Sequence, residues 1–335
     1  MKLKVAALGA IAALTLSACS GAAEPTSSPS TSSGGGTTPA SSPAAESYTI
    51  GIAQIVTHPA LDAVAEGFKE AFAEAGIEVT FDEQNAQGDQ ATLTNIANTF
   101  ASSDADGFLA IATPTAQSLA TVITDRPVVF AAVTDPVAAG LVASWESPDA
   151  NLAGVSDLNP MKDQLELIKE ALPEAKTVGI VYSAGEVNSE VQVTEAEKAA
   201  AELGLEIKKA TVTNSSEVQQ AAASLDVDAF LIPTDNTVVS AAESVIQVGE
   251  QKQIPVFASD ESTMERGAAA GLSVNYTQQG KDAAAIMLKL LEGTPAADIP
   301  VETQKEFDLF VNVAAGGLQG LTLPDSIVSR ATKQF

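Results

Sequence analysis

The chain has 335 residues, of which 17 are Lys or Arg and 43 are Asp or Glu, so its formal net charge is −26. Nucleic acid is excluded as a partner, because phosphate recognition needs clustered positive charge and this chain has no basic cluster. Cys19 is the only cysteine, so the chain must fold around an apolar core without a disulfide.

The first 18 residues have the pattern of a bacterial export signal. Lys2 and Lys4 precede an apolar stretch, Val5–Leu16, that is too short to remain as a membrane span. The residues Leu16-Ser17-Ala18-Cys19 resemble a lipobox, in which the Cys carries diacylglycerol and becomes the first mature residue. We therefore predict removal of residues 1–18 and a lipid-anchored protein on the extracytoplasmic face of the cell membrane. The alternative is an ordinary secretory peptide with an incidental Cys.

Residues 19–47 are predicted to be the lipidated Cys followed by a tether. They are rich in Ser, Thr, Gly, Pro and Ala, a composition that cannot bury enough apolar surface to fold. A flexible coil of this length has a root-mean-square reach of roughly 30 Å. The tether would thus hold the folded part close to the membrane.

Strands and helices are predicted to alternate from Tyr48 onward. The strands are short and almost continuously apolar, which is typical of parallel strands covered by helices on both faces. The first predicted strands are Tyr48–Ile55, Ile77–Phe81, Gly107–Ala112, the residues after Pro127, and Leu152–Val155, with helices at Ala60–Glu74, Gln90–Ser102 and after Thr113. Asp89 is expected to cap the second helix, and Gly76 to end the first.

The second half of the chain repeats the pattern of the first. The unit Asp106–Pro136 recurs as Asp228–Ser262, and Gly51 and Pro127 match Gly179 and Pro255 at one constant offset. Repetition at this scale favours two duplicated βαβ lobes over a solenoid, whose repeats are far shorter. The pattern does not assign a lobe to the late elements, which are predicted at Gln278–Glu292, Phe307–Val311 and Pro324–Arg330.

The residues needed for catalysis or metal binding are absent from the sequence. His58 is the only histidine, and the chain has no GxSxG, HExxH, CxxC or GxxxxGK motif. We therefore predict that the protein is not an enzyme and has no metal or cofactor. His58 is interpreted as a loop residue without a role in proton transfer.

The stretch Thr113-Pro114-Thr115-Ala116-Gln117 follows a central predicted strand and begins a helix. A hydroxyl cap at Thr113, Pro114 at the first helical position and free backbone N–H groups together favour an anion. Ordinary helix capping explains Thr113 and Pro114 equally well. The position of this loop at a strand end favours a ligand, because parallel sheets bind ligands beyond the carboxyl ends of their strands.

Three further turns are expected to place carboxylates at the same crevice. They contain Thr134-Asp135, Thr234-Asp235-Asn236 and Asp260. A zwitterion needs an anion site and a carboxylate together, so these turns are candidates for its ammonium group. Helix N-capping, at which Asp and Thr are favoured, is the competing explanation for each Asp.

Many segments of the chain resemble ABC-transporter substrate-binding lipoproteins for tryptophan or tyrosine, which have the type I periplasmic-binding-protein fold. The resemblance covers nearly the whole mature chain and is carried by IGIAQIVTHPALDAVAEGF, QNAQGDQATL, AIATPTAQS, AAVTDPVAAGLV, GVSDLNPMKDQLELIKEALPEAKTVGIVY, NSEVQV, TVTNSSEVQQAAASL, PTDNTVVSA and IPVFASDES.

This resemblance implies an α/β fold with two Rossmann-like lobes, each built on a parallel sheet and joined by a three-strand hinge. It places residues 48–157 and 277–305 in the first lobe, and residues 158–276 and 306–335 in the second. It also implies an amino-acid ligand held between the lobes and delivered to an ABC permease driven by a separate ATPase. The cleft residues that it implies are Gln54, His58, Gln87, Thr113, Thr115, Gln117, Thr134, Asp135, Asp157, Asn188, Thr234, Asp235, Asn236 and Asp260.

Several alternatives to amino-acid import remain open at this point. A lipid-anchored sensor would present its closed form to a receptor instead of a permease, and the ligand could be another small polar solute. An extracytoplasmic hydrolase would need a nucleophile and a base that the sequence does not provide. Phe and Tyr are sparse, so the sequence does not identify an aromatic partner for a ligand ring.

Overall fold

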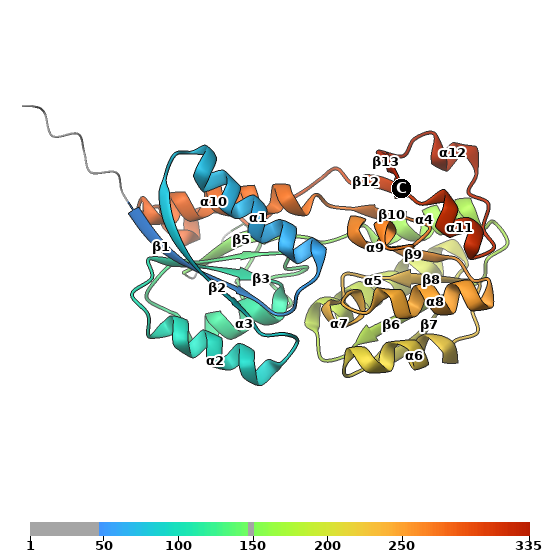
Figure 1. Ribbon diagram of the computed structural model, residues 1–335, viewed down its shortest axis with the longest axis horizontal. Helices are drawn as coiled ribbons and strands as arrows, with labels where there is room; N and C mark the ends of the chain where they lie inside the picture. Colours follow the sequence, from blue (N-terminus) through green and yellow to red (C-terminus); the bar gives the residue numbers. More distant parts are fainter. Residues whose placement is uncertain (1–46, 147–150) are drawn as a thin grey trace, which may run out of the picture. The chain divides into compact units, whose positions relative to one another are not determined.

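The computed structural model describes residues 47–146 and 151–335, which all belong to one compact unit (Figure 1). The predicted signal peptide, the lipid site at Cys19 and the tether up to residue 46 lie outside the described residues. The tether was predicted to include Ser47, but the first strand begins there. None of the described helices is long and apolar enough to cross a membrane.

The first sheet has six strands, all parallel, in the order β11-β5-β4-β3-β1-β2. Its central strands are fully buried, as the continuous apolar runs predicted. The strands are β1 Ser47–Gln54, β2 Glu78–Asn85, β3 Gly107–Ile111, β4 Val128–Ala131, β5 Leu152–Ser156 and β11 Glu302–Thr303.

Strand β2 is longer than its sequence predicts. The apolar pattern ends at Phe81, but β2 pairs with β1 in parallel register from Ser47↔Glu78 to Gln54↔Asn85. It lies at the edge of the sheet, where half-exposed polar side chains are tolerated because only one side of the strand is paired. Asn85 was predicted to begin the loop and instead ends the strand.

The second sheet has seven strands in the order β13-β12-β10-β9-β8-β6-β7. All neighbouring strands are parallel except β10 and β12, which run antiparallel. The strands are β6 Thr177–Ser183, β7 Glu206–Val212, β8 Ala229–Ile232, β9 Val256–Ala258, β10 Ala270–Ser273, β12 Asp308–Val311 and β13 Lys333–Gln334. The two mostly parallel sheets confirm the predicted α/β fold class.

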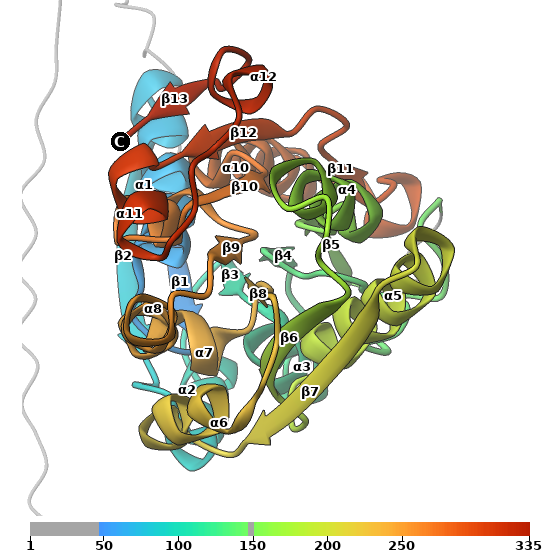
Figure 2. The same cartoon turned by 90° about the vertical axis from the view of Figure 1, so that its right-hand side faces the viewer.

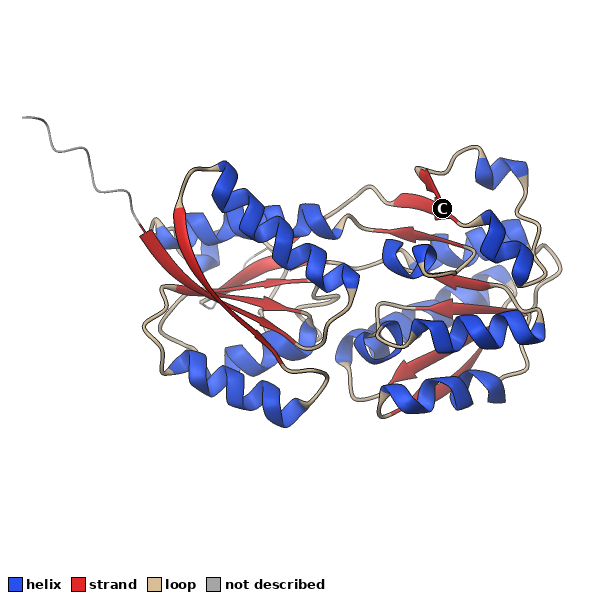
Figure 3. Cartoon of the chain, in the orientation of Figure 1, coloured by secondary structure: helices blue, strands red, loops and turns tan. Residues whose placement is uncertain are grey.

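Helices cover both faces of each sheet (Figures 2 and 3). On the first sheet, α1 and α10 lie on one face and α2 and α3 on the other (Figure 1). On the second sheet, α4 and α5 lie opposite α6, α7 and α8 (Figure 2). The helices are α1 Pro59–Glu74, α2 Gln90–Ala101, α3 Thr113–Val122, α4 Met161–Ala171, α5 Val187–Leu203, α6 Val218–Ser224, α7 Asn236–Val239, α8 Ala242–Lys252, α9 Glu261–Glu265, α10 Tyr276–Leu291, α11 Val313–Leu318 and α12 Asp325–Val328, with short 3-10 turns at Ser215–Glu217 and Ala296–Asp298.

Helix α10 crosses from the second half of the chain to pack on α1 of the first. Two glycines allow the backbones to approach closely: a Cβ at Gly67 would lie 2.1 Å from the Thr277 carbonyl oxygen, and one at Gly280 would lie 2.1 Å from that of Val64. Such distances are far inside van der Waals contact, so only glycine fits at these two positions. The sequence pattern left the lobe of this helix undecided, and the packing decides it.

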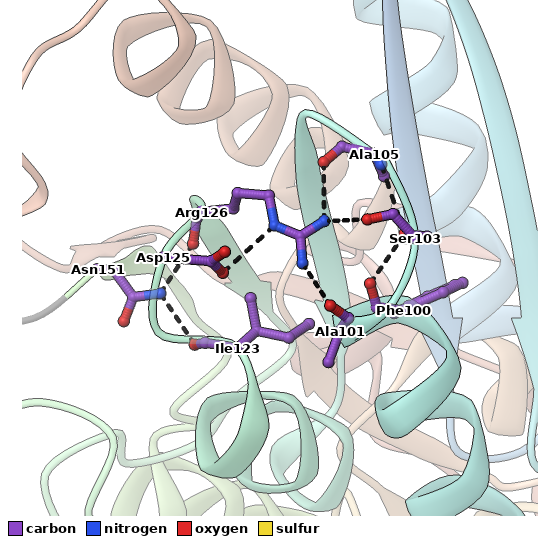
Figure 4. Close-up of polar contacts among 8 residues, drawn as sticks. All are labelled: Phe100, Ala101, Ser103, Ala105, Ile123, Asp125, Arg126 and Asn151. Atoms are coloured by element: carbon purple, nitrogen blue, oxygen red, sulfur yellow. Dashed lines mark hydrogen bonds and ion pairs between the residues drawn. The ribbon is translucent and has the colours of Figure 1, made fainter.

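The connection from α2 to β3 is held by Arg126, which lies just before β4 (Figure 4). Its guanidinium lies 5.0 Å from the centre of the Phe108 ring. It also donates hydrogen bonds to three carbonyl oxygens at and after the end of α2, those of Ala101 (2.8 Å), Ser103 (2.6 Å) and Ala105 (3.2 Å). A cation at the carbonyl end of a helix is favourable because it meets the unpaired oxygens there. Arg126 thus fixes the end of α2 against the first sheet.

Candidate functional site

Two cavities lie where loops from the carboxyl ends of both sheets meet. The inner cavity has a volume of about 20 Å³ and is lined by residues that follow β1, β4, β5, β8, β9 and β10. The outer cavity has a volume of about 820 Å³, and Asn236 lines both. The inner cavity is lined by His58, Ala60, Leu61, Ala132, Asp157, Thr234, Asn236, Val239, Asp260 and Tyr276.

His58 enters the inner cavity from the start of α1. It occupies the N-cap position with extended backbone, Pro59 is the first residue of the helix, and the His58 side chain makes no capping hydrogen bond. The residue is 7% exposed, and its Nδ1 has no hydrogen-bond partner. Burial lowers the pKa of the imidazole, against the opposing charge of Asp260. The side chain is therefore neutral at pH 7 and offers a free ring nitrogen to the cavity.

Asp157 lies at the crossover from β5 to α4. One carboxylate oxygen accepts a hydrogen bond from the Thr134 hydroxyl and the other from the Tyr276 hydroxyl, both at 3.1 Å. Burial raises the pKa of Asp157 to about 6, although both hydrogen bonds oppose the increase. Burial, followed by the charge of Asp157, also raises the pKa of Tyr276 well above its usual value. Asp157 thus joins three segments that are far apart in the sequence.

Asp260 has one carboxylate oxygen that no donor reaches. Its Oδ1 accepts hydrogen bonds from the Thr263 backbone N–H and the Ser262 hydroxyl, which begin α9. Its Oδ2 is buried without a partner, and the residue is 1% exposed. A buried carboxylate oxygen without a donor is costly, so this atom is available to a cationic ligand.

Asp235, in contrast, is fully hydrogen-bonded within its own half of the chain. Its Oδ1 caps α7 at the Val238 N–H, and its Oδ2 accepts from the Ser183 N–H and the Ser189 hydroxyl, both at 2.6 Å. Burial raises its pKa to about 7, with a further contribution from the charge of Glu186. Asp235 lines neither cavity, and these contacts are those of a structural cap.

Asp135 is half-buried and lies away from the inner cavity. It accepts hydrogen bonds from the N–H groups of Val137 and Ala138, and so closes its own turn. It lines a separate groove of about 350 Å³ together with Glu190 and other residues of α5. The three candidate carboxylates therefore have three different surroundings.

The start of α3 differs from the prediction at Thr113. The N-cap residue is Ala112, and Thr113 is already helical, so the predicted hydroxyl cap at Thr113 is wrong. The reason is that Ala112 donates its N–H to Ala131 on β4 and then turns at φ 79° and ψ 155°, a conformation that costs roughly 1–3 kcal/mol for a residue with a side chain. The hydroxyls of Thr113 and Thr115 are buried without partners. These two groups are positioned close to the free N–H groups of the helix.

The other predicted cleft residues fall into two groups. Gln87 and Gln117 line the outer cavity, and Thr234 and Asn236 line the inner one. The predicted residues that line neither cavity are Gln54, Thr113, Thr115, Thr134, Asp135, Asn188 and Asp235. Thr134 still acts on the inner cavity through Asp157.

Several residues of the two cavities were not among the predicted cleft residues, and Tyr276 and Glu186 are the two with the most extensive polar contacts to the predicted ones. Tyr276 contacts Asp157, and its position between a buried strand and the N-terminus of α10 is the sequence signal that could have identified it. Glu186 lines the outer cavity and accepts hydrogen bonds from Asn236 and Thr237 at the start of α7. Its contacts are long-range, and no local pattern marks them. Within residues 47–146 and 151–335, no group of acidic, His or Cys side chains could hold a metal ion.

The model of the family described as ABC transporter substrate binding protein matches residues 49–335. The chain belongs to this family. It is 39% identical over 269 residues to a "Tyrosine-binding protein" of Clostridioides difficile, covering 78% of each chain. The family consists of solute-binding proteins that work outside the cytoplasm, and they are not enzymes, as the sequence predicted.

Solved structures with the same fold include two at more than 30% identity. A conserved domain protein from Vibrio cholerae has a TM-score of 0.85 and 38% identity, and the match covers 87% of this chain and all of that one. An ABC domain in complex with L-Trp from Streptococcus pneumonia has a TM-score of 0.84 and 32% identity over the same shares. These neighbours confirm the type I periplasmic-binding-protein fold.

Proposed function

We propose that this protein captures an aromatic amino acid between its two sheets and delivers it to an ABC permease. The observation that carries the proposal is the pair of unpartnered buried atoms on the inner cavity, Nδ1 of His58 and Oδ2 of Asp260. Leaving such an atom unpaired costs about 1–3 kcal/mol, which a bound polar ligand would recover. A relative named for tyrosine and a structural neighbour bound to L-Trp support the choice of ligand.

The two ends of the amino acid would be held by different loops. Asp260 would bind the ammonium group, because it is the one of the three candidate carboxylates that has a buried, unpartnered oxygen and lines the inner cavity. The start of α3 would bind the carboxylate, because helix N-termini favour anions and Pro114 and Gln117 of this segment line the outer cavity. The hydroxyls of Thr113 and Thr115 in the same turn line neither cavity but are buried without partners.

The outer cavity would accommodate the ligand ring. Its volume of about 820 Å³ is ample for an indole or a phenol. Apolar contacts come from Ile55, Val56, Ala97 and Val122, and the residues around it include no Phe, Tyr or Trp. We infer that the ring is held by aliphatic packing and by neutral hydroxyl and amide groups, which suits the phenol of tyrosine and the indole N–H of tryptophan.

Capture would involve movement of two lobes, residues 48–157 with 277–305 and residues 158–276 with 306–335. These boundaries are supported by the strands, because β11 joins the first sheet whereas β12 and β13 join the second. The hinge would lie near Asp157, Tyr276 and Phe307, where the chain passes between the sheets. Small-angle scattering should show a smaller radius of gyration at ligand saturation, and an unchanged radius would contradict closure.

A direct test of the function is a thermal-shift and calorimetry screen against the twenty amino acids. A ligand at 100 times its dissociation constant should stabilise the folded chain by about 2.7 kcal/mol. We expect L-tryptophan, L-tyrosine or L-phenylalanine to give the largest increase in melting temperature, and their D-enantiomers to give none. Absence of binding by all three would reject the proposed ligand class.

The membrane anchor is a separate part of the proposal. Cys19 would carry the lipid, and Cys19→Ala should move the protein from the membrane fraction to the soluble fraction. A variant that stays in the membrane fraction after a salt wash would contradict lipid attachment at this residue. Transport itself would be tested by comparing uptake of the labelled amino acid in cells that express the wild-type protein and in cells that express Cys19→Ala.

A further inference from the structure

We propose that a bound amino acid and a proton compete for the inner cavity, so that ligand binding expels the proton of Asp157 and acidification releases the ligand. The inference rests on the proposed function, because it needs a ligand with an ammonium group. It concerns how the site is regulated.

The inner cavity is lined by two carboxyl groups and by no Lys or Arg. Asp157 and Asp260 both line its volume of about 20 Å³, and the other ionisable groups on its wall are His58 and Tyr276. Neither carboxyl group has an ion-pair partner among the described residues; the side chains that donate to Asp157 are the neutral hydroxyls of Thr134 and Tyr276. Two such charges in one small buried site are unfavourable unless one is neutralised.

A proton on Asp157 removes one of the two negative charges when no ligand is present. Asp157 is a suitable site for it because the two side chains that contact its carboxyl group are hydroxyls, which can reorient to accept as well as donate. Asp260 accepts hydrogen bonds at Oδ1 from the Thr263 backbone N–H, which can only donate, and from the Ser262 hydroxyl. Burial raises the pKa of Asp157 to about 6, in agreement with this geometry.

An ammonium group in the cavity supplies the same neutralisation from the ligand. When it binds, Asp157 transfers its proton to solvent, and the carboxylate is then stabilised by the ligand charge. Two further charged residues affect His58: the charge of Arg266 lowers the pKa of the imidazole, and the charge of Asp62 raises it. Below about pH 6 the ligand must displace a proton, and its affinity should fall by up to tenfold for each pH unit.

The test is calorimetry of the full chain with its aromatic amino acid between pH 5 and pH 8, in pairs of buffers with different ionisation enthalpies. We expect proton release near pH 6 in the wild-type protein and a loss of affinity at lower pH. Asp157→Asn should bind more weakly, with an affinity that no longer depends on pH in this range. Failure of the wild-type protein to bind at any pH would reject the proposed function, whereas pH-independent binding would reject only the proton exchange.

Two control variants identify the group that exchanges the proton. His58→Gln removes a ring nitrogen from the cavity and should weaken binding, but it should keep the proton release for each ligand bound, since the imidazole is neutral. Asp235→Asn should also keep it, because Asp235 lines neither cavity. If either control loses the proton release while Asp157→Asn keeps it, Asp157 is not the group that exchanges the proton. If Asp157→Asn does not fold, Tyr276→Phe serves instead: it removes one donor to the carboxylate and should move the onset of proton release to higher pH.

Discussion

The two halves of the described chain, one around each sheet, repeat the same contacts at matching positions. A Cβ at Gly51 would lie 2.8 Å from the Phe108 ring, and one at Gly179 would lie 2.9 Å from the Phe230 ring. In each half the aromatic ring on the neighbouring strand occupies the space over a glycine, so the ring can pack directly on the backbone. The duplication seen in the sequence is therefore also a duplication of packing.

The ends of the matching helices α2 and α6 are also held in similar ways. Arg126 donates to three carbonyl oxygens at the end of α2 and stacks on Phe108, whereas Lys252 donates to the carbonyl oxygens of Ala223 and Leu225 at the end of α6. The role is the same, but the ammonium group lacks the planar fork of the guanidinium. These contacts are far from the cavities and preserve the scaffold.

The halves differ where their strands end at the cavities. In the second half the carboxylates of Asp235 and Glu186 accept several hydrogen bonds each from nearby loops. Buried polar atoms without partners occur in both halves, at His58, Thr113 and Thr115 in the first and at Asn159, Asn188 and Asp260 in the second. The packing of the sheets thus preserves the repeated contacts, whereas the polar contacts of the loops that end at the cavities differ between the halves.

Among the variants considered, Asp260→Asn and Asp235→Asn should show the largest difference, and it should be a difference in ligand affinity. Asp260→Asn removes a charge from the inner cavity while its amide oxygen can still accept from Thr263, so binding should weaken by roughly 2–5 kcal/mol, a thirtyfold or greater loss. The ligand-free melting temperature should change little. Calorimetry and thermal melting of the same samples measure both quantities.

Asp235→Asn is the matched control for that measurement. It replaces a carboxylate that accepts three hydrogen bonds within the second half, so it should lower stability more than affinity. Normal binding by Asp260→Asn would show that another group holds the ammonium. A large loss of stability in that variant would instead support a purely structural cap.

The ligand-free protein should lose stability as the pH rises from about 4 to 6. Asp157 keeps its proton in the folded chain up to about pH 6, whereas in the unfolded chain it loses it near 3.8. The unfolded state thus binds fewer protons in this window, and the free energy of unfolding should fall with rising pH, with at most about 3 kcal/mol of the fall coming from Asp157. Urea unfolding at pH 4, 5 and 6 measures the change.

Asp157→Asn should remove about half of this pH dependence between pH 4 and pH 6, because the amide does not titrate. The part that remains should come from Asp235, whose pKa is raised to about 7 and whose effect extends to higher pH. If the variant keeps the full wild-type slope between pH 4 and pH 6, the buried carboxyl of Asp157 is not its source.

Gly51→Ala and Gly179→Ala test whether the two scaffolds are equivalent in energy. Each new methyl group would meet a ring that is almost fully buried, so each variant should be destabilised by about 1–3 kcal/mol. Denaturant unfolding should give similar losses for the two. A loss in one variant alone would show that the second half tolerates the change differently, despite its matching geometry. Gly317→Ala, where no atom lies within 4 Å, is the control.

The smallest effect is expected for Arg126→Met and Lys252→Met, which should differ only a little in their free energies of unfolding. Both variants leave carbonyl oxygens without a charged donor, but Arg126 has more contacts and is the less exposed of the two. We expect a loss of about 1–3 kcal/mol for the arginine and about 1 kcal/mol for the lysine, measured by denaturant unfolding. A greater loss at Lys252 would contradict this ranking.

The sequence by itself determined the class of fold and the positions of most elements. Buried parallel strands such as β3 and β8 must be apolar along their whole length, so their sequences are sufficient to identify them. Asp89 was correctly predicted as the cap of α2, since it accepts from the Thr92 N–H at 2.6 Å, and Gly76 ends α1 at φ 70° as predicted. These are local interactions, and the local residues specify them.

Only the tertiary structure decided which polar residues remain available to a ligand. Asp235 and Asp260 both precede a short helix and both cap it, so their local sequences predict the same role. They differ because Ser183 and Ser189, about fifty residues away along the chain, reach the second oxygen of Asp235 and no donor reaches that of Asp260. The start of α3 at Thr113 and the extension of β2 to Asn85 were likewise set by pairing with neighbouring strands. Long-range hydrogen bonds leave no periodic signal in a sequence, and they are what separates a structural cap from a binding group.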